Sequence, residues 1–247
     1  SYNPILAFAI YLLSHIVLFN KYLTKFEFFF YSFFVIIMTI NMFITGGRAG
    51  QVMYIATLVI LIFQYFNNEK IKSLLLIMLI IPSILFTAYN TSELFKNRVN
   101  YGVSDVLQYS QNKNTSIGLR INFALNSFEI IKKNPILGVG TGDFPDEYKI
   151  INSIKSPNLP NVTNPHNMYA LVFSQLGLLG LISMLSIFYY QFRLSVLSDN
   201  KFIRDVGFAM PLLFLIIMWS DSYLLGHYTA LVYVFFSAFL YKDFEKT

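Results

Sequence analysis

Apolar residues fill seven stretches of the chain, and polar or charged residues separate each stretch from the next. Most of these stretches approach 20 residues, the length of a helix that crosses a hydrocarbon core of about 30 Å. Lipid offers the backbone no hydrogen-bond partner, so such stretches are expected to be helices. The predicted spans are residues 4–20, 26–45, 51–66, 74–90, 168–192, 206–223 and 227–241.

This pattern predicts an all-α integral membrane protein, a polytopic helix bundle with about seven spans. Membrane helices are expected within residues 1–90 and 168–247, and one long polar loop, residues 91–167, lies between them. The chain opens at Ser1 without the basic head of a signal peptide, which leaves open that N-terminal helices of a longer protein are missing.

The long loop contains one segment with helical periodicity, residues 116–133. Its apolar stripe consists of Ile117, Ile121, Ala124, Leu125, Phe128 and Ile131. Thr115 or Ser116 can cap the start of this helix, and Pro135 ends it. We expect an amphipathic helix that rests on the membrane surface or on the bundle, whereas residues 103–114 are expected to be irregular.

The composition agrees with lipid as the surrounding solvent. Hydrophobic residues make up 55% of the chain and charged residues 13%, whereas a soluble domain carries about a quarter charged residues. The pI of about 9.2 does not indicate nucleic-acid binding, because most Lys and Arg residues flank the apolar stretches. The sequence has no cysteine, so thiol chemistry and disulfides are excluded.

Positive charges predict an orientation, because Lys and Arg are concentrated in the cytoplasmic loops of membrane proteins. If the long loop faces outward, nine cations lie on inner connections and one, Arg48, lies on a short outer connection. The inner cations are Lys21, Lys25, Lys70, Lys72, Arg193, Lys201, Arg204, Lys242 and Lys246. The first residue is therefore expected outside and the last residue inside.

Two arginines are candidates for binding an anionic ligand at the outer face. Arg48 lies in TGGRAG at the outer end of the second span, and the glycines before it would allow a ligand close to the backbone. Arg120 lies on the polar margin of the amphipathic helix. Guanidinium groups bind phosphate oxygens bidentately, so the two would suit a diphosphate. A snorkelling anchor and a solvated surface arginine are the structural alternatives.

His166, in NPHNMY immediately before the fifth span, is the candidate general base, because histidine titrates near neutral pH. A role in a turn or helix cap is the alternative. Asp221 and His227, in WSDSYLLGHY beside the expected hairpin of the last two spans, are secondary candidates. Ionisable residues near membrane depth are functional candidates by default, although a structural hydrogen bond explains both equally well.

Other polar features favour structural roles. His15 lies nearer the inner end of the first span and is expected to make a core hydrogen bond. GVGTG follows a helix instead of a strand, so it lacks the context of a dinucleotide-binding motif. Gly177 and Gly180 are expected to allow close helix packing. The three histidines are well separated and no carboxylate cluster has ligand spacing, so we expect neither a metal nor another cofactor.

Several of these segments together resemble the O-antigen ligase and O-antigen polymerase family of bacterial inner membranes. The resemblance is carried by TGGRAG, SIGLRINFALNSFEIIKKNPILGVGTGDF and NPHNMYALVFSQLGLLGLISML, which follow the family's order over roughly residues 40–192. Family members have more than seven membrane helices, in keeping with missing N-terminal spans. The resemblance implies a GT-C-like, multi-pass bundle in the inner membrane, with an active site that faces the periplasm.

The family's enzymes transfer a glycan from undecaprenyl diphosphate without a metal. By resemblance, Arg48 and Arg120 would hold the diphosphate, His166 would take the proton of the acceptor hydroxyl, and the anomeric configuration would invert. The ligase branch, which we slightly prefer, uses lipid A-core oligosaccharide as acceptor, and the polymerase branch uses another carrier-linked glycan. A flippase or transporter would predict discontinuous helices, which the sequence does not suggest, and an envelope scaffold would leave these residues without a purpose.

Overall fold

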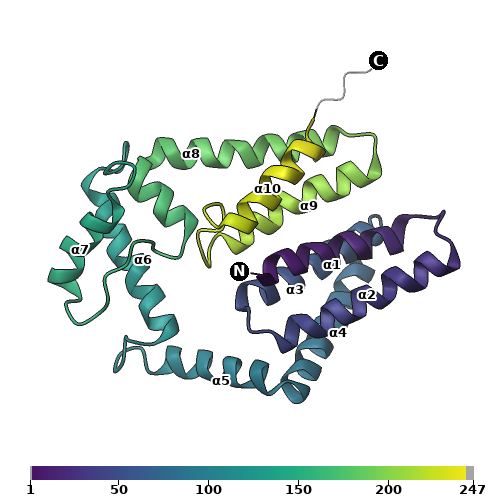
Figure 1. The fold of residues 1–247 in the computed structure, drawn as a ribbon, viewed down its shortest axis with the longest axis horizontal. Helices are drawn as coiled ribbons and strands as arrows, with labels where there is room; N and C mark the ends of the chain where they lie inside the picture. Colours follow the sequence, from purple (N-terminus) through teal and green to yellow (C-terminus); the bar gives the residue numbers. More distant parts are fainter. Residues whose placement is uncertain (1, 243–247) are drawn as a thin grey trace. The chain divides into compact units, whose positions relative to one another are not determined.

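The computed structural model describes residues 2–242, so the predicted inner cation Lys246 lies outside the described residues. Across these residues the protein is helical, and no strand is found. The chain divides into two compact units (Figure 1). Unit 1 contains the residues up to Arg98, Leu194–Ile217 and the residues from His227 on, and unit 2 contains Val99–Arg193 and Met218–Gly226.

The helices of unit 1 come from both ends of the chain. They are α1 (Tyr2–Phe19), α2 (Lys25–Ile44), α3 (Arg48–Tyr65), α4 (Lys70–Thr91), α9 (Lys201–Ile217) and α10 (His227–Leu240). Those of unit 2 are α6 (Ser116–Lys133) and α7 (Phe144–Lys155). Two helices belong to both units, α5 (Glu93–Leu107) and α8 (Met168–Leu197).

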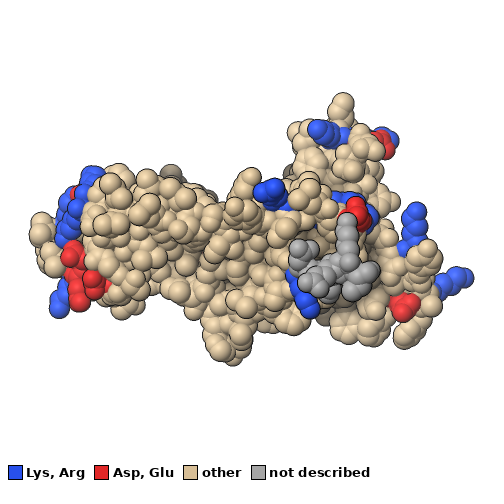
Figure 2. Space-filling model, turned by 90° about the horizontal axis from the view of Figure 1, so that it is seen from above, with Lys and Arg blue, Asp and Glu red and all other residues tan. Residues whose placement is uncertain are grey.

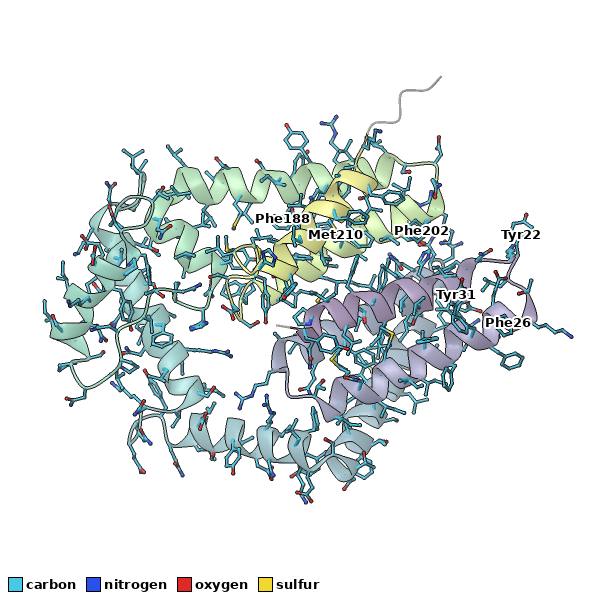
Figure 3. The ribbon with its side chains drawn as sticks, viewed as in Figure 1. Tyr22, Phe26, Tyr31, Phe188, Phe202 and Met210 are labelled. Atoms are coloured by element: carbon cyan, nitrogen blue, oxygen red, sulfur yellow. The ribbon has the colours of Figure 1, made fainter. Side chains whose placement is uncertain are left out.

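Unit 1 has a buried core and a wide apolar surface. Tyr11 of α1, Met53 of α3 and Met210 of α9 are at most 1% exposed, and Figure 3 labels Met210. By contrast, only 11% of the residues in an apolar 18-residue stretch of α2, and the same share in α4, are buried. Phe26, labelled in Figure 3, is 75% exposed at the start of α2. Exposed apolar surface of this extent fits contact with lipid.

A polar cluster around Asp205 confirms the core hydrogen bond predicted for His15. The Nε2 atom of His15 lies 3.0 Å from Oδ2 of Asp205, and the two side chains are 4% and 10% exposed. Lys201 donates to the same carboxylate oxygen at 2.7 Å. Gln64 donates from Nε2 to the backbone oxygen of Asp205 at 3.0 Å. These contacts tie α1, α3 and α9 together.

Helices occupy all seven predicted spans, and five of them are long and apolar enough to cross a membrane. These five are α1, α2, α3, α4 and α8. Within the described residues, α9 has 17 residues and α10 has 14. The total of seven spans therefore remains a prediction. Pro211 lies inside α9, as neighbouring helices in a bundle allow.

The sixth predicted span is displaced in the structure. α9 begins at Lys201, before the predicted start at residue 206, because the side chain of Asn200 accepts the backbone N–H of Phe202 at 2.9 Å. The helix ends at Ile217, short of the predicted residue 223, and the nine residues 218–226 that lead to α10 belong to unit 2. The tight hairpin predicted between the last two spans is therefore wrong.

The helices of the long loop differ from the prediction in two respects. α6 begins and ends where the sequence predicts, and the side chain of Thr115 accepts the N–H of Gly118 at 3.1 Å. However, Leu125 and Phe128 of the predicted stripe are 56% and 54% exposed. Residues 103–107 belong to α5, so the irregular segment predicted there is wrong in its first part.

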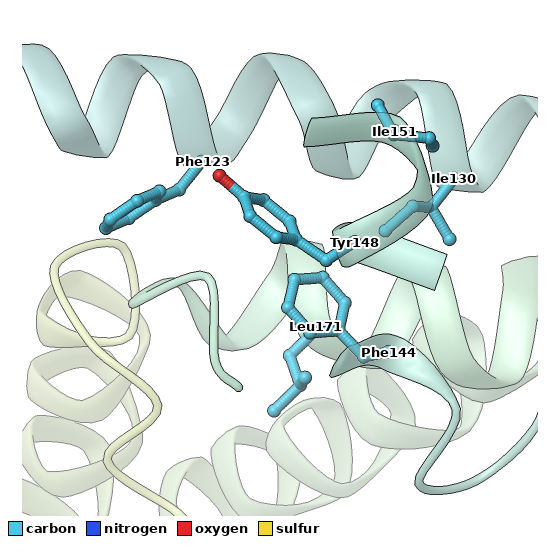
Figure 4. Packing of buried hydrophobic residues seen from close by; sticks show 6 residues of the cluster. All are labelled: Phe123, Ile130, Phe144, Tyr148, Ile151 and Leu171. Carbon is cyan, nitrogen blue, oxygen red and sulfur yellow. The ribbon is translucent and has the colours of Figure 1, made fainter. Parts of the chain in front are cut away.

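Unit 2 is built around a core that α6, α7 and the start of α8 share (Figure 4). Its members are Phe123, Ile130, Phe144, Tyr148, Ile151 and Leu171. Asn122 and Asn126 donate to the Tyr148 hydroxyl at 3.4 and 3.3 Å, and Asn126 also donates to Asn152 Oδ1 at 3.2 Å. Buried amides are stable when they are paired, so α6 can bury this partly polar face. Burial raises the pKa of Tyr148.

Charged residues of both signs lie side by side on α6 and α7, which Figure 2 shows at the left of the view. Lys155 donates to Glu129 at 2.8 Å and Lys132 donates to it at 3.3 Å. These two hydrogen bonds hold the pKa of the Glu129 carboxyl below its usual value. Lys133 pairs with Glu147. Exposed ion pairs of this kind indicate that this surface meets water.

α8 is broken at Gly177, whose φ is 64° and ψ is −163°. The Gly-rich turn before α7 lies against the break and bonds to it through the backbone. The N–H of Val139 donates to the carbonyl of Ser174, and the N–H of Leu178 donates to the carbonyl of Pro135, both at 2.9 Å. The turn thus bonds to backbone groups that the break releases from the helix.

Two glycines make this contact possible. A Cβ atom on Gly177 would overlap the carbonyl of Ile136, and one on Gly138 would overlap the backbone of Gln175. The helix packing predicted for Gly177 is therefore wrong, because the residue admits a turn and not a second helix. The interruption also corrects the expectation that the chain has no discontinuous helix.

Candidate functional site

The segment before α8 and the connection between α9 and α10 lie side by side in unit 2. The N–H of Met168 donates to the carbonyl of Met218 at 2.9 Å. The hydroxyl of Ser222 donates to Oδ1 of Asn164 at 2.8 Å. These two hydrogen bonds hold residues 164–168 against residues 218–222, and the candidate base His166 lies between the bonded positions.

The candidate base His166 contacts Asp221 across this pair of segments. Nδ1 of His166 lies 3.1 Å from Oδ1 of Asp221. An ionised carboxylate has no proton to give, so Nδ1–H is the donor, and the neutral imidazole then has its lone pair on Nε2. The two side chains are 43% and 40% exposed. The imidazole is therefore oriented by the protein and still open to a substrate.

The backbone of His166 is unusual. Among residues 2–242, it is the one non-glycine residue with a positive φ, 52°. Its N–H donates to Oδ1 of Asn164 at 2.8 Å, and its ring centroid lies 5.9 Å from that of Phe123. Conformations of this kind persist where surrounding contacts hold them, and they are concentrated at functional sites.

A helix cap does not explain His166. Asn167 occupies that place, because its Oδ1 accepts the N–H of Ala170 at 3.0 Å in the first turn of α8. Asn167 also donates from Nδ2 to the carbonyl of Trp219 at 3.3 Å. The cap alternative for His166 is therefore wrong, whereas the turn alternative agrees with its φ of 52° and with the bond from its N–H to Asn164.

Arg120 lies in the same unit as His166. It is exposed on α6, one turn before Phe123, whose ring faces the imidazole. Residues three apart share a helix face. Arg120 therefore lies on the same side of α6 as Phe123, whose ring is next to that of His166.

Arg48 belongs to unit 1, where it is the first residue of α3 and half-buried. Gly47, the residue before it, has no side chain to cap the helix. The first N–H groups of a helix have no intrahelical partner, and together with the helix dipole they attract anions. The guanidinium and the helix terminus therefore add positive potential at the same turn.

The glycines of TGGRAG lie against neighbouring side chains, and the expectation that they admit a ligand close to the backbone remains a prediction. A Cβ atom on Gly46 would overlap the guanidinium of Arg98, and one on Gly47 would overlap the side chain of Asn3. Nη1 of Arg98 donates to the carbonyl of Gly46 at 2.7 Å. The sequence interpretation missed Arg98 because it lies 52 residues further along the chain.

Asn3 adds a donor at this turn. Its side chain is buried, and among the described residues its Nδ2 has no hydrogen-bond partner. Its Oδ1 accepts the Thr45 hydroxyl at 3.3 Å. The sequence does not single out Asn3, because one Asn before an apolar run is common at the start of a helix.

The two secondary candidates differ in their surroundings. Asp221 orients His166, whereas His227 is exposed at the start of α10 in unit 1, with its ring 5.3 Å from that of Tyr228. Among residues 2–242, no three His, Asp or Glu side chains form a group that could hold a metal ion. Metal-independent chemistry remains a prediction.

Comparison of the sequence with known proteins shows which protein family the chain belongs to. A family model described as O-antigen ligase matches residues 33–185, which is more than half of the chain. The chain belongs to the O-antigen ligase family. The resemblance stated from the sequence motifs is therefore confirmed. The matched O-antigen ligase region contains Arg48, Arg120 and His166, whereas Asp221 and His227 follow it.

A relative of this O-antigen ligase family member occurs in Haemophilus influenzae (strain Rd), where it is an uncharacterized protein. The two are 33% identical over 112 residues, which is 43% of this chain and 27% of the relative. The match thus spans about a quarter of the relative's length.

Proposed function

We propose that this member of the O-antigen ligase family is a glycosyltransferase. It moves an O-antigen-type glycan from undecaprenyl diphosphate to lipid A-core oligosaccharide, at the periplasmic face of the bacterial inner membrane. The observation that carries the proposal is the pair His166–Asp221, a half-exposed imidazole oriented by a carboxylate at 3.1 Å. The family match and the five apolar helices support the membrane setting.

In the proposed reaction, Nε2 of His166 accepts the proton of an acceptor hydroxyl as the hydroxyl oxygen bonds to the anomeric carbon. The bond from that carbon to the diphosphate oxygen breaks, and the diphosphate leaves with the electron pair. The attacking and leaving groups lie on opposite faces of the carbon, so the configuration inverts. Asp221 is a positioning residue, because it holds the imidazole and stabilises its protonated form.

Arg48 and Arg120 are proposed to bind the diphosphate of the donor. Charge on the leaving group grows as the bond breaks, so fixed guanidinium groups stabilise the transition state. They take the place of a divalent ion in this proposal, which therefore includes no metal and no cofactor. The proposal is supported by the half-buried position of Arg48 at the start of α3 and by the exposed position of Arg120 on α6.

Transport of a lipid-linked glycan is less well supported, although α8 is broken. In transporters, the backbone groups of a broken helix bind the substrate or its coupling ion. At Gly177 the turn before α7 bonds to the backbone on both sides of the break. The break therefore favours a structural role.

The acceptor distinguishes the ligase from the alternative, an O-antigen polymerase. The complete protein, purified in lipid nanodiscs with excess EDTA, would receive a carrier-linked glycan together with either lipid A-core or a second carrier-linked repeat unit. Mass spectrometry of the products gives the answer. Glycan on lipid A-core supports the ligase, and a longer carrier-linked glycan supports the polymerase. If neither product forms, the proposal of glycosyl transfer is contradicted. Activity that is lost in EDTA and restored by magnesium or manganese would contradict the arginine mechanism.

A further inference from the structure

A groove in unit 1 lies at the end of α3 that is remote from Arg48. It has a volume of about 640 Å³ and runs between the last turns of α3 and the first turns of α9. Because α3 extends from Arg48 to Tyr65, its 18 residues separate the two ends by about 27 Å at the helical rise of 1.5 Å per residue. The groove is therefore separate from the proposed donor site at Arg48.

The groove has an apolar wall and a polar mouth. Its apolar side chains include Val59, Ile60, Phe63, Phe208 and Leu212. Its polar side chains are Gln64, Asn67, Lys201, Arg204 and Asp205. The polar residues lie at one end of both helices, near the connections that follow α3 and precede α9. This division matches a lipid, which has a polar headgroup and an apolar chain.

The charges at the mouth amount to one net positive charge. Asp205 pairs with Lys201 at 2.7 Å, and the two charges cancel. Arg204 is exposed, and its guanidinium makes one long hydrogen bond, 3.4 Å, to the carbonyl of Ser198. Its other N–H groups can bind the oxygens of a phosphate. Arg204 is thus the cation that a ligand would meet.

We propose that this groove binds a phospholipid with a single negative charge, such as phosphatidylglycerol. The phosphate bonds to Arg204, and the upper part of one acyl chain lies along the wall formed by Ile60 and Leu212. Charge complementarity selects this occupant: one net cation matches one net anion, whereas a zwitterionic lipid such as phosphatidylcholine brings its own ammonium group, which competes with Arg204 for the phosphate and is repelled by it. A basic pocket between membrane helices is a common site for anionic headgroups on the cytoplasmic side, where the charge count places this end of α3.

This lipid would bridge two helices that the Asp205 cluster already joins. Most residues that line the groove belong to α3 and α9, with Val196 of α8 beside them, and the cluster ties α3 and α9 to α1 through His15. A bound lipid therefore adds contacts that the unfolded chain does not make, and it stabilises the folded protein by mass action. The proposal is independent of glycan transfer, because it involves neither His166 nor Arg48.

The first experiment compares the complete protein in nanodiscs of phosphatidylcholine with and without phosphatidylglycerol. Native mass spectrometry after transfer to detergent measures retained phosphatidylglycerol, and a thermal scan measures the unfolding midpoint. We expect retention and a higher midpoint with phosphatidylglycerol, and loss of both in Arg204→Gln. Arg193→Gln is the matched control, since Arg193 is exposed at the end of α8 and does not line the groove. Equal losses in the two variants, or no preference in the unsubstituted protein, would overturn the site.

The second experiment separates a lipid from free phosphate. Leu212→Trp fills the wall and leaves Arg204 in place, so it should lower retention of phosphatidylglycerol, whereas Leu185→Trp on exposed α8 surface should not. Inorganic phosphate added to phosphatidylcholine nanodiscs should leave the unfolding midpoint unchanged. A rise with phosphate alone, together with full lipid retention in Leu212→Trp, would show an anion site without a lipid chain and contradict the proposal.

Discussion

The carboxylate of Asp221 meets the imidazole of His166 across 55 residues of sequence, with Oδ1 and Nδ1 3.1 Å apart. The same Oδ1 atom accepts the N–H of Ser222 at 2.8 Å. The carboxylate is therefore fixed by its own backbone before it orients the histidine. A pair held in this way can be tested by changing either partner separately.

Asp221→Asn keeps the size of the side chain but removes its charge and allows the wrong imidazole tautomer. We expect kcat to fall by about one to two orders of magnitude, less than the ~10²- to 10⁴-fold that general-base catalysis contributes, with KM for the donor nearly unchanged. Asp221→Glu should recover part of the activity. Asp199→Asn is the control, because Asp199 is exposed in the connection before α9. A normal kcat in Asp221→Asn would remove Asp221 from the mechanism.

His166→Ala removes the proposed base. Turnover of the complete protein should fall by about 10²- to 10⁴-fold, while the affinity for the lipid-linked donor should stay nearly the same. His227→Ala is the control, since its ring contacts Tyr228 and not the pair. The amount of folded protein in the membrane must be equal for both variants. If His227→Ala is inactive and His166→Ala is not, the base lies on α10.

Arg48→Lys keeps a positive charge but loses the planar fork that binds two phosphate oxygens. We expect a higher KM for the donor and a lower kcat, and Arg120→Ala should weaken donor binding in the same direction. Arg193→Lys, on the exposed end of α8, should behave as the unsubstituted protein. Donor titrations that give identical constants for Arg48→Lys and the unsubstituted protein would argue against bidentate binding.

Gly177→Ala and Gly142→Ala test the contact between the turn and α8. Both glycines have a positive φ, 64° and 91°, so each substitution should destabilise the protein by roughly 1–3 kcal/mol. Only at Gly177 does the new methyl group also overlap a backbone, the carbonyl of Ile136, whereas the space around Gly142 is open. Thermal unfolding in detergent should therefore show a larger loss for Gly177→Ala. Equal losses of stability in the two variants would mean that the close approach of the turn to Gly177 does not contribute to stability.

The orientation can be tested with single cysteines in a chain that has none. Cysteines at Asn112 and Asn158 should react with an impermeant thiol reagent added from the periplasmic side, and one at Asn200 should not. All three positions are exposed, so access depends on the side of the membrane. Labelling of the cysteine at Asn200 alone would reverse the orientation and move the proposed active site to the cytoplasm.

Features that depend on neighbouring residues could be predicted from the sequence. The start of α6 follows from the side chain of Thr115, and its end follows from Pro135, both of which act within one turn. The face that α6 buries could not be predicted, because Asn122 and Asn126 are paired by residues of α7. A hydrophobic pattern assigns such amides to the surface unless the partner is known.

The candidate site shows the same limit. His166 could be found because NPHN precedes an apolar run, where a titratable side chain meets the membrane surface. Its partner Asp221 was a secondary candidate, and Arg98 was missed, since each reaches its contact from more than 50 residues away. Local sequence identifies a reactive side chain, whereas folding decides which distant residue orients it.

The break at Gly177 divides α8 into two helical segments, a shorter rod of residues 168–176 and a longer rod of residues 178–197. Residues 178–197 form a helix of 20 residues, and at 1.5 Å per residue they extend about 30 Å, which is the thickness of the hydrocarbon core. Residues 168–176 are bonded to the loop and carry His166 just before their first turn. The longer rod is therefore long enough to cross the hydrocarbon core without the nine residues before the break. A crossing made by the longer rod alone keeps the first turns of α8 and His166 outside the hydrocarbon core, beside the Gly-rich turn that bonds to them.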